Sequence, residues 1–204
     1  MNFEFDNVYK IFLKRMNEIE KNLELVNYKG KFLIEIKKNK DTELKEVKEY
    51  IRLVEETYNS VMEYNALIIS IYGCLENFID DLLKEYLMYL EKIHAKYENL
   101  PSKMKEVHVK NIGDFLQNSQ RFSKELDVTQ VIRKLYSCFS DGKYNLNYEF
   151  ILRHGGNLKI DKICELFNNV GIENLREKIW KSEEFIEYFK EENQFENYGK
   201  AEEF

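Results

Sequence analysis

The chain has 204 residues and a mass of 24.7 kDa, which predicts one globular domain, or one domain with a small appendage. Hydrophobic residues make up 44% and charged residues 33%, with one proline and eight glycines, so a disordered or collagen-like chain is excluded and helices are favoured over strands. A net charge of −6 leaves no overall basic field, so any nucleic-acid site must be local.

Three features favour a cytoplasmic protein. The cysteines Cys74, Cys138 and Cys164 stand far apart in apolar runs, which fits buried thiols better than disulfides or a zinc cluster. Residues 1–10 include acidic side chains and no cleavage site, unlike a signal peptide. The most apolar window, residues 66–90, is interrupted by charges, so no membrane span is expected.

The first helix is predicted from apolar residues that recur at steps of three and four. They are Phe12, Met16, Ile19, Leu23 and Val26. We expect Gly30 to end this helix or to follow its end closely. Residues 32–36 are ambiguous, and the simplest interpretation is a connector.

The same spacing then continues from Leu44 to Leu82 without a proline, after the N-cap candidates Asp41 and Thr42. It predicts one very long helix or two nearly collinear helices. From residue 66 onward a second apolar face is present, so neighbouring helices should wrap this part of the central helix.

Two shorter helices are predicted next. Pro101 and Ser102 mark a break and a new N-cap, followed by a helix through Leu116. Asp127 with Gln130 resembles a capping box, which predicts the start of the second helix.

The last third of the chain mixes helices with irregular segments. Residues 144–152 fit either a strand or an irregular segment. Asn157 precedes a compact helix that should end near Gly171, and residues 172–189 should form one or two short helices. The pattern along the whole chain therefore predicts an all-α fold.

Two carboxylates on the central helix are candidates for acid or base chemistry. Glu76 and Asp80 are four residues apart and share a face, with Tyr72 one turn earlier. Close carboxylates raise the pKa of one partner, which prepares it for proton transfer. A solvated helix strip explains the same pair, because Asp81 and Lys84 are nearby.

A second cluster contains Arg153 and His154, followed by two glycines and Asn157. Backbone amides at a helix N-terminus, with a neighbouring arginine and histidine, can bind phosphate. An ordinary exposed glycine turn accounts for the same residues.

No metal or cofactor is expected. His94 and His108 have no Cys, His or carboxylate at metal-ligand spacing, so both are expected to be structural or exposed. The sequence also lacks a P-loop, a dinucleotide glycine fingerprint, HExxH and a nucleophile elbow.

Two blocks of the sequence resemble HEPN-like nucleases of the MAE type. Residues 68–80, Ile-Ile-Ser-Ile-Tyr-Gly-Cys-Leu-Glu-Asn-Phe-Ile-Asp, are similar to the family helix in which an apolar run leads through Tyr into Glu, a small residue and Phe. Residues 156–172 resemble the family's Ser-Asn-Leu segment, which opens a helix that ends in an apolar-Gly-apolar triplet. The order and separation of both blocks agree with the family over about residues 60–172.

This resemblance implies a single HEPN-like all-α bundle over residues 1–204, commonly a homodimer. It implies a metal-independent ribonuclease of toxin-antitoxin or phage-defence systems, with RNA in a groove at the dimer interface and an antitoxin or defence-system protein as partner. Glu76 matches the family's helix acid and is the candidate catalytic residue. Asp80 has no counterpart, whereas Arg153, His154 and Asn157 are candidates for binding RNA phosphate.

The sequence departs from the family at the catalytic Arg and His. In the family a His follows an Arg after four to six residues, and none of the six arginines here has such a histidine. In relatives this motif follows the Asn-Leu helix and one more helix, about where residues 200–204 stand. We expect the motif either to lie beyond Phe204 or to be missing from this member. The competing hypothesis is a non-catalytic helical module that binds a partner or itself through the apolar stripe of residues 44–61.

Overall fold

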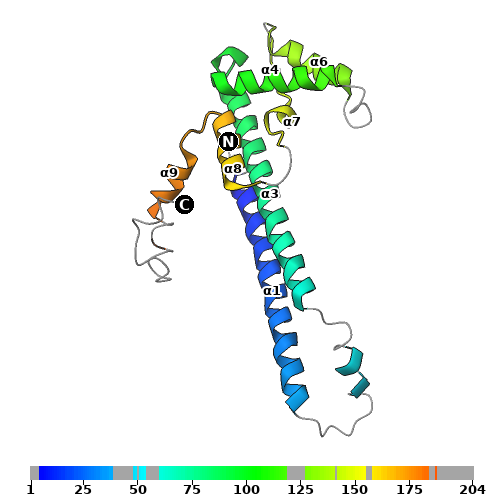
Figure 1. Ribbon diagram of the computed structural model, residues 1–204. Coiled ribbons are helices and arrows are strands. Elements are labelled where there is room, and N and C mark those ends of the chain that lie inside the picture. The colour runs from blue at the N-terminus through cyan, green and yellow to red at the C-terminus, as the bar shows by residue number, and fades with distance from the viewer. Residues whose placement is uncertain are drawn as a thin grey trace. The chain divides into compact units, whose positions relative to one another are not determined.

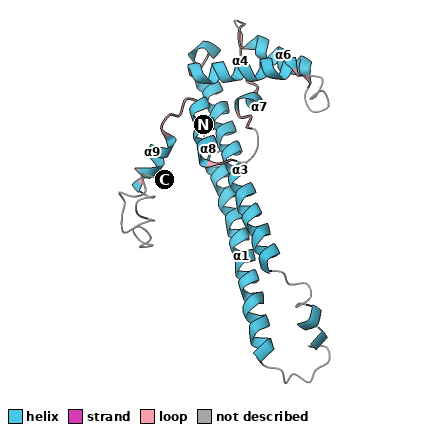
Figure 2. Cartoon of the chain, viewed as in Figure 1, coloured by secondary structure: helices cyan, strands magenta, loops and turns pink. Residues whose placement is uncertain are grey.

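The computed structural model describes residues 5–38, 48–49, 51–53, 60–118, 127–140, 142–154, 158–183 and 187. Every secondary-structure element in these ranges is helical (Figure 1), and none of them contains a strand (Figure 2). The predicted all-α class is therefore confirmed. The chain divides into two compact units, residues 1–85 and residues 86–204, and the single domain expected over the whole chain stays a prediction.

The first unit is an antiparallel helical hairpin. Helix α1 spans Phe5–Lys38 and helix α3 spans Ser60–Ile93, and the two lie side by side within this unit (Figure 1). Phe12 near the start of α1 packs on Phe78 of α3, with ring centroids 4.4 Å apart. Edge and tilted aromatic contacts of this kind add to the apolar burial that holds two helices together.

Polar pairs join the two helices at the other end of the hairpin. The hydroxyl of Tyr64 donates to Oδ1 of Asn27 at 2.5 Å, and Nζ of Lys29 lies 3.2 Å from Oε1 of Glu63. Residue 12 contacts residue 78, whereas residue 29, later in α1, contacts residue 63, earlier in α3. The two helices therefore run in opposite directions.

The expected end of the first helix at Gly30 is wrong, because α1 continues through residues 32–36 to Lys38. A glycine inside a helix costs about 1 kcal/mol relative to alanine, which tertiary contacts can offset. Here Leu33 is buried one turn after the glycine, and Lys29 immediately before it pairs with Glu63 of α3. These contacts keep the helix intact.

Helix α3, with 34 residues, is the long helix predicted from the apolar spacing. Most of the predicted stretch before it, with Asp41 and Thr42, lies outside the described residues. Leu87 is fully buried, but Ile68 and Ile69 are 63% and 71% exposed, so the expected covering of the helix on every side fails at its N-terminal half. In the described ranges, neither α3 nor any other helix is apolar over a length sufficient to cross a bilayer.

The second unit contains the end of α3 and a set of shorter helices. In chain order these are η1 (Tyr97–Asn99), α4 (Ser102–Gln117), α6 (Val128–Ser137), α7 (Tyr148–Ile151), α8 (Ile160–Asn169) and α9 (Leu175–Trp180). Helix α4 is the central one, since it contacts α6, α7 and α8. Its residues Ile112 and Phe115 form a buried cluster with Val131 and Phe150.

The predicted start of α6 at Asp127 is confirmed, since its carboxylate accepts the backbone N–H of Thr129 at 2.9 Å, which makes Asp127 the N-cap; the capping box with Gln130 stays a prediction. Helix α4 begins directly after Pro101, also as expected. Residues 144–152 were expected to be a strand or an irregular segment. Residues 144–147 are irregular, but that expectation is wrong for residues 148–151, which form helix α7.

Gly171 ends α8 near the predicted position and has a backbone φ of +88°. Its N–H bonds to the carbonyl of Asn168 at 3.0 Å, and the N–H of Ile172 bonds to Phe167 at 2.9 Å, which is a Schellman motif. A Cβ atom at position 171 would lie only 2.8 Å from Cγ of Pro101. Both the backbone conformation and the close approach therefore require glycine.

Replacing Gly171 by alanine should lower the free energy of unfolding by about 1–3 kcal/mol, because it adds left-handed backbone strain and a clash with Pro101. Gly113→Ala in α4 is the matched control: the added methyl group would have no atom within 4 Å, so it should raise stability by up to about 1 kcal/mol. Urea unfolding followed by circular dichroism measures both changes. Effects of the same sign would contradict the role assigned to Gly171.

Candidate functional site

The carboxylates predicted to act in catalysis lie on one face of α3. Tyr72, Glu76 and Asp80 occupy successive turns of this continuous helix, and all three are half-buried. Burial, and then the negative charge of Glu76, raise the pKa of Tyr72 above its ordinary value. The Tyr72 hydroxyl is enclosed and makes no hydrogen bond within the described part of the chain. The three side chains thus form one polar strip, and the catalytic role of Glu76, with Asp80 as its acidic neighbour, stays a prediction.

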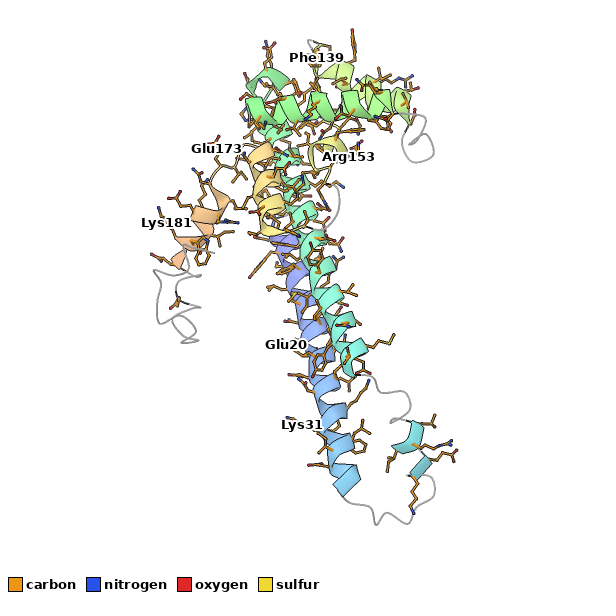
Figure 3. All side chains as sticks on the ribbon, in the orientation of Figure 1. Glu20, Lys31, Phe139, Arg153, Glu173 and Lys181 are labelled. Carbon is orange, nitrogen blue, oxygen red and sulfur yellow. The ribbon has the colours of Figure 1, made fainter. Side chains whose placement is uncertain are left out.

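The predicted phosphate-binding residues lie in the second unit. Arg153 is exposed and His154 is half-buried, directly after α7 and before α8, and Figure 3 labels Arg153 there. Asn157 lies outside the described residues. The groove expected to bring Glu76 beside these residues would join side chains from both units, and it also stays a prediction.

A hydrogen-bonded cluster that sequence reasoning missed surrounds residues 145–147 of the second unit. Three consecutive backbone N–H groups there are each accepted by a side chain from a different helix. The pairs are Asn145 with Ser137 Oγ of α6 (3.0 Å), Leu146 with Glu91 Oε1 of α3 (2.7 Å), and Asn147 with His108 Nε2 of α4 (3.2 Å). The bond of Asn147 is buried, that of Leu146 is partly buried and that of Asn145 is exposed, and together they join this segment to three helices.

His108 is fully buried and neutral in this cluster. Its Nε2 accepts from the Asn147 N–H, which can only donate, so the single proton of the neutral ring is on Nδ1. Nδ1 therefore donates to the hydroxyl oxygen of Tyr97 at 3.0 Å. Burial, and then the positive charge of Lys134, lower the pKa of His108 to about 4. The ring is a structural acceptor at neutral pH, in line with the structural role expected for it.

Glu91 is held by two donors on one segment. Its Oε1 accepts the N–H of Leu146 at 2.7 Å, and its Oε2 accepts the hydroxyl of Tyr148. Burial, and then this hydrogen bond, raise the pKa of Tyr148 above its ordinary value. The carboxylate is thus fixed in orientation while remaining part of the surface.

The cysteines are free thiols, and Cys74 and Cys138 are buried as expected, whereas Cys164 is half-buried. Burial, followed by the charge of Glu91, raises the pKa of Cys138 to about 11, which disfavours the nucleophilic thiolate. Over the described ranges, no three His, Cys, Asp or Glu side chains gather as metal ligands.

Comparison of the sequence with models of known families identifies the family of this chain. A model described as RiboL-PSP-HEPN matches residues 12–200, which include the α3 strip and Arg153 with His154. The chain belongs to the RiboL-PSP-HEPN family. The predicted HEPN-like family is thereby confirmed, and the match extends well beyond the two blocks on which the resemblance rested. No match was found among curated proteins or solved structures.

The neutral His108 makes the stability of this HEPN chain depend on pH. Its pKa is about 4 when folded against 6.5 when unfolded, so the unfolded chain takes up the proton first as the pH falls. The contribution of neutral His108 to the free energy of unfolding is fully present above pH 6.5. About 3 kcal/mol of it is lost between pH 6.5 and pH 4. Urea unfolding at several pH values measures this loss.

His108→Gln is the variant that tests this assignment, because glutamine can accept the Asn147 N–H but does not titrate. We expect the variant to be less stable than the wild-type chain at pH 7.5 and to depend less steeply on pH below 6.5. Identical pH slopes for the two proteins would show that another group titrates instead.

Proposed function

We propose that this chain is an RNA-directed HEPN protein of a toxin-antitoxin or phage-defence system, with an antitoxin or another defence protein as partner. The observation that carries the proposal is the RiboL-PSP-HEPN match over residues 12–200. The all-helical fold of the described residues supports it as well.

The chemistry expected of such a protein needs an Arg and a His that this sequence does not supply at family spacing. Metal-independent RNA cleavage would use His to move a proton and Arg to stabilise the charge that develops on the phosphorus. None of the six arginines is followed by a histidine five to seven residues later. We therefore propose that residues 1–204 together bind RNA without cleaving it, and that Arg153 and His154 contact the RNA phosphate.

RNA binding and cleavage can be measured together with an end-labelled single-stranded RNA. We expect the RNA to be retained by the protein and to stay intact on a denaturing gel. Arg153→Gln should weaken binding about threefold to tenfold, because it removes one charge-assisted phosphate contact. Arg176→Gln is the matched control, since Arg176 is an exposed arginine that pairs with Asp161, and it should leave the affinity unchanged.

Two outcomes would contradict this proposal. Absence of RNA binding would remove the RNA-directed function. Robust cleavage that is lost in Arg153→Gln or in His154→Gln would show that these two residues form the nuclease centre.

We also propose that the chain forms a homodimer through α3. Val61, Met62, Ile68 and Ile69 are between 63% and 71% exposed, and they form two pairs, each seven residues apart. Residues seven apart lie on one side of a helix, so these side chains form an apolar stripe that a second copy can cover. The stripe is also the observation that favours the alternative function, a helical interaction module.

The double variant Ile68→Glu with Ile69→Glu should turn the dimer into a monomer, because it places four charges in the symmetric interface. Sedimentation velocity measures the change in mass. Ile160→Glu, at an isoleucine of α8 that is 48% exposed, is the control and should stay dimeric. A wild-type chain that is monomeric at micromolar concentration would contradict the proposed dimer.

A further inference from the structure

Helix α6 and the turn after it have an apolar face that the described part of the chain leaves uncovered. Ile132, Tyr136 and Phe139 are 48%, 73% and 68% exposed. They are four and three residues apart, so they lie on one side of the helix, whereas Val131 and Cys138 on the other side are buried. An exposed apolar patch of this kind marks a surface that binds another segment or another protein.

The ring of Phe139 is held in position by the rest of the unit. The N–H of Phe139 bonds to the carbonyl of Tyr136 at 3.1 Å, which continues the side of α6 into the following turn. Its ring meets the buried ring of Tyr97 edge-on, with centroids 5.5 Å apart, and Tyr97 also packs against Tyr144. Figure 3 labels Phe139 at the end of α6. A face that is already ordered loses little conformational entropy when it binds.

The charges around this face favour an acidic occupant over a second copy of the face. The charged residues of the described segments that carry the face are Lys96, Arg133, Lys134 and Lys143, against Glu91, Glu98 and Asp127. Asp127 is at the end of α6 remote from Phe139, and both oxygens of Glu91 already accept hydrogen bonds. A second copy docked through the same face would bring the cations of both copies together, whereas an acidic segment would be attracted.

The last 22 residues of the sequence have the matching composition. Residues 183–204 contain eight glutamates and two lysines, a formal charge of −6. The whole chain also has a formal charge of −6, so residues 1–182 are formally neutral and the excess negative charge belongs to this segment. Its six aromatic residues can cover an apolar face with large ring surfaces. They are Phe185, Tyr188, Phe189, Phe195, Tyr198 and Phe204.

The segment is long enough to reach the face. It follows α9 within the same unit, and Glu183 and Glu187, which the structure describes, are exposed. The residues after Glu187 span up to about 55 Å when extended. A folded unit of about 100 residues has a radius of gyration of only about 13 Å. Covalent attachment also gives the segment an effective concentration on the order of millimolar, so individually weak contacts suffice.

We propose that residues 183–204 dock on the apolar face of α6, with aromatic side chains against Ile132, Tyr136 and Phe139 and glutamates beside Arg133 and Lys143. The occupant is therefore a segment of this same chain. The inference goes beyond the proposed function, because it requires neither RNA binding nor the dimer through α3, whose apolar stripe is a different surface.

Photo-cross-linking of the intact chain tests this proposal. The variant Tyr136→p-benzoylphenylalanine keeps an aromatic ring at the position and makes it photoreactive, and mass spectrometry identifies the cross-linked peptides. We expect cross-links from position 136 to residues 183–204. The matched control is Tyr28→p-benzoylphenylalanine in α1, since Tyr28 is 67% exposed. It should give at least about tenfold fewer cross-links to this segment.

The charge contribution is tested in the same photoreactive chain. Adding Arg133→Glu with Lys143→Glu should lower the yield of this cross-link at least about threefold, because two attractions become repulsions. The control pair, Lys110→Glu with Lys159→Glu, changes two exposed lysines of the same unit away from the face and should leave the yield unchanged. Circular dichroism shows whether each variant keeps its helices.

A mixture of nitrogen-15-labelled and unlabelled chains distinguishes the possible occupants. Cross-links between position 136 and residues 183–204 of the same chain support the proposal. Cross-links to any segment of a second copy would assign the face to an interface between chains and would overturn it. It is also overturned if position 136 cross-links to residues 183–204 no more often than position 28 does, or if the charge reversals leave the yield unchanged. None of these outcomes depends on RNA binding, so the proposed function and this inference can fail separately.

Discussion

Three backbone N–H groups in a row join the end of α3 to α4 and α6 in the second unit. Each N–H of residues 145–147 needs an acceptor, and the acceptors are side chains of three helices that are far apart in the sequence. Loss of the acceptor of Asn147 would leave a buried donor unsatisfied, at a cost of about 1–3 kcal/mol. The same requirement explains why Nε2 of the buried His108 accepts from Asn147, and why Oε1 of Glu91 accepts from Leu146.

Helices could be predicted from the sequence wherever the information is local. The spacing of apolar residues and the capping residue Asp127 gave α3, α4 and α6, because both depend on neighbours within one or two turns. The continuation of α1 beyond Gly30 could not be predicted in this way. It depends on Leu33 and on the ion pair of Lys29 with Glu63, and Glu63 is 34 residues away.

The candidate site likewise has one part that local sequence predicts and one part that depends on distant residues. The shared face of Tyr72, Glu76 and Asp80 follows from helical geometry alone. The cluster around residues 145–147 does not, because its hydrogen bonds join residues up to 55 positions apart. One signal was available: His108 stands midway between Met104 and Ile112, both buried, at steps of four. A polar residue within such an apolar stripe is expected to be buried and hydrogen-bonded.

The contact between Gly171 and Pro101 links the end of α8 to the residue that precedes α4. The two positions are 70 residues apart in the sequence but touch in space, since even a methyl group on residue 171 would overlap the ring of Pro101. In related chains these positions should therefore covary: a bulkier residue at 171 is compatible only with a smaller residue at 101 and a helix end of different geometry.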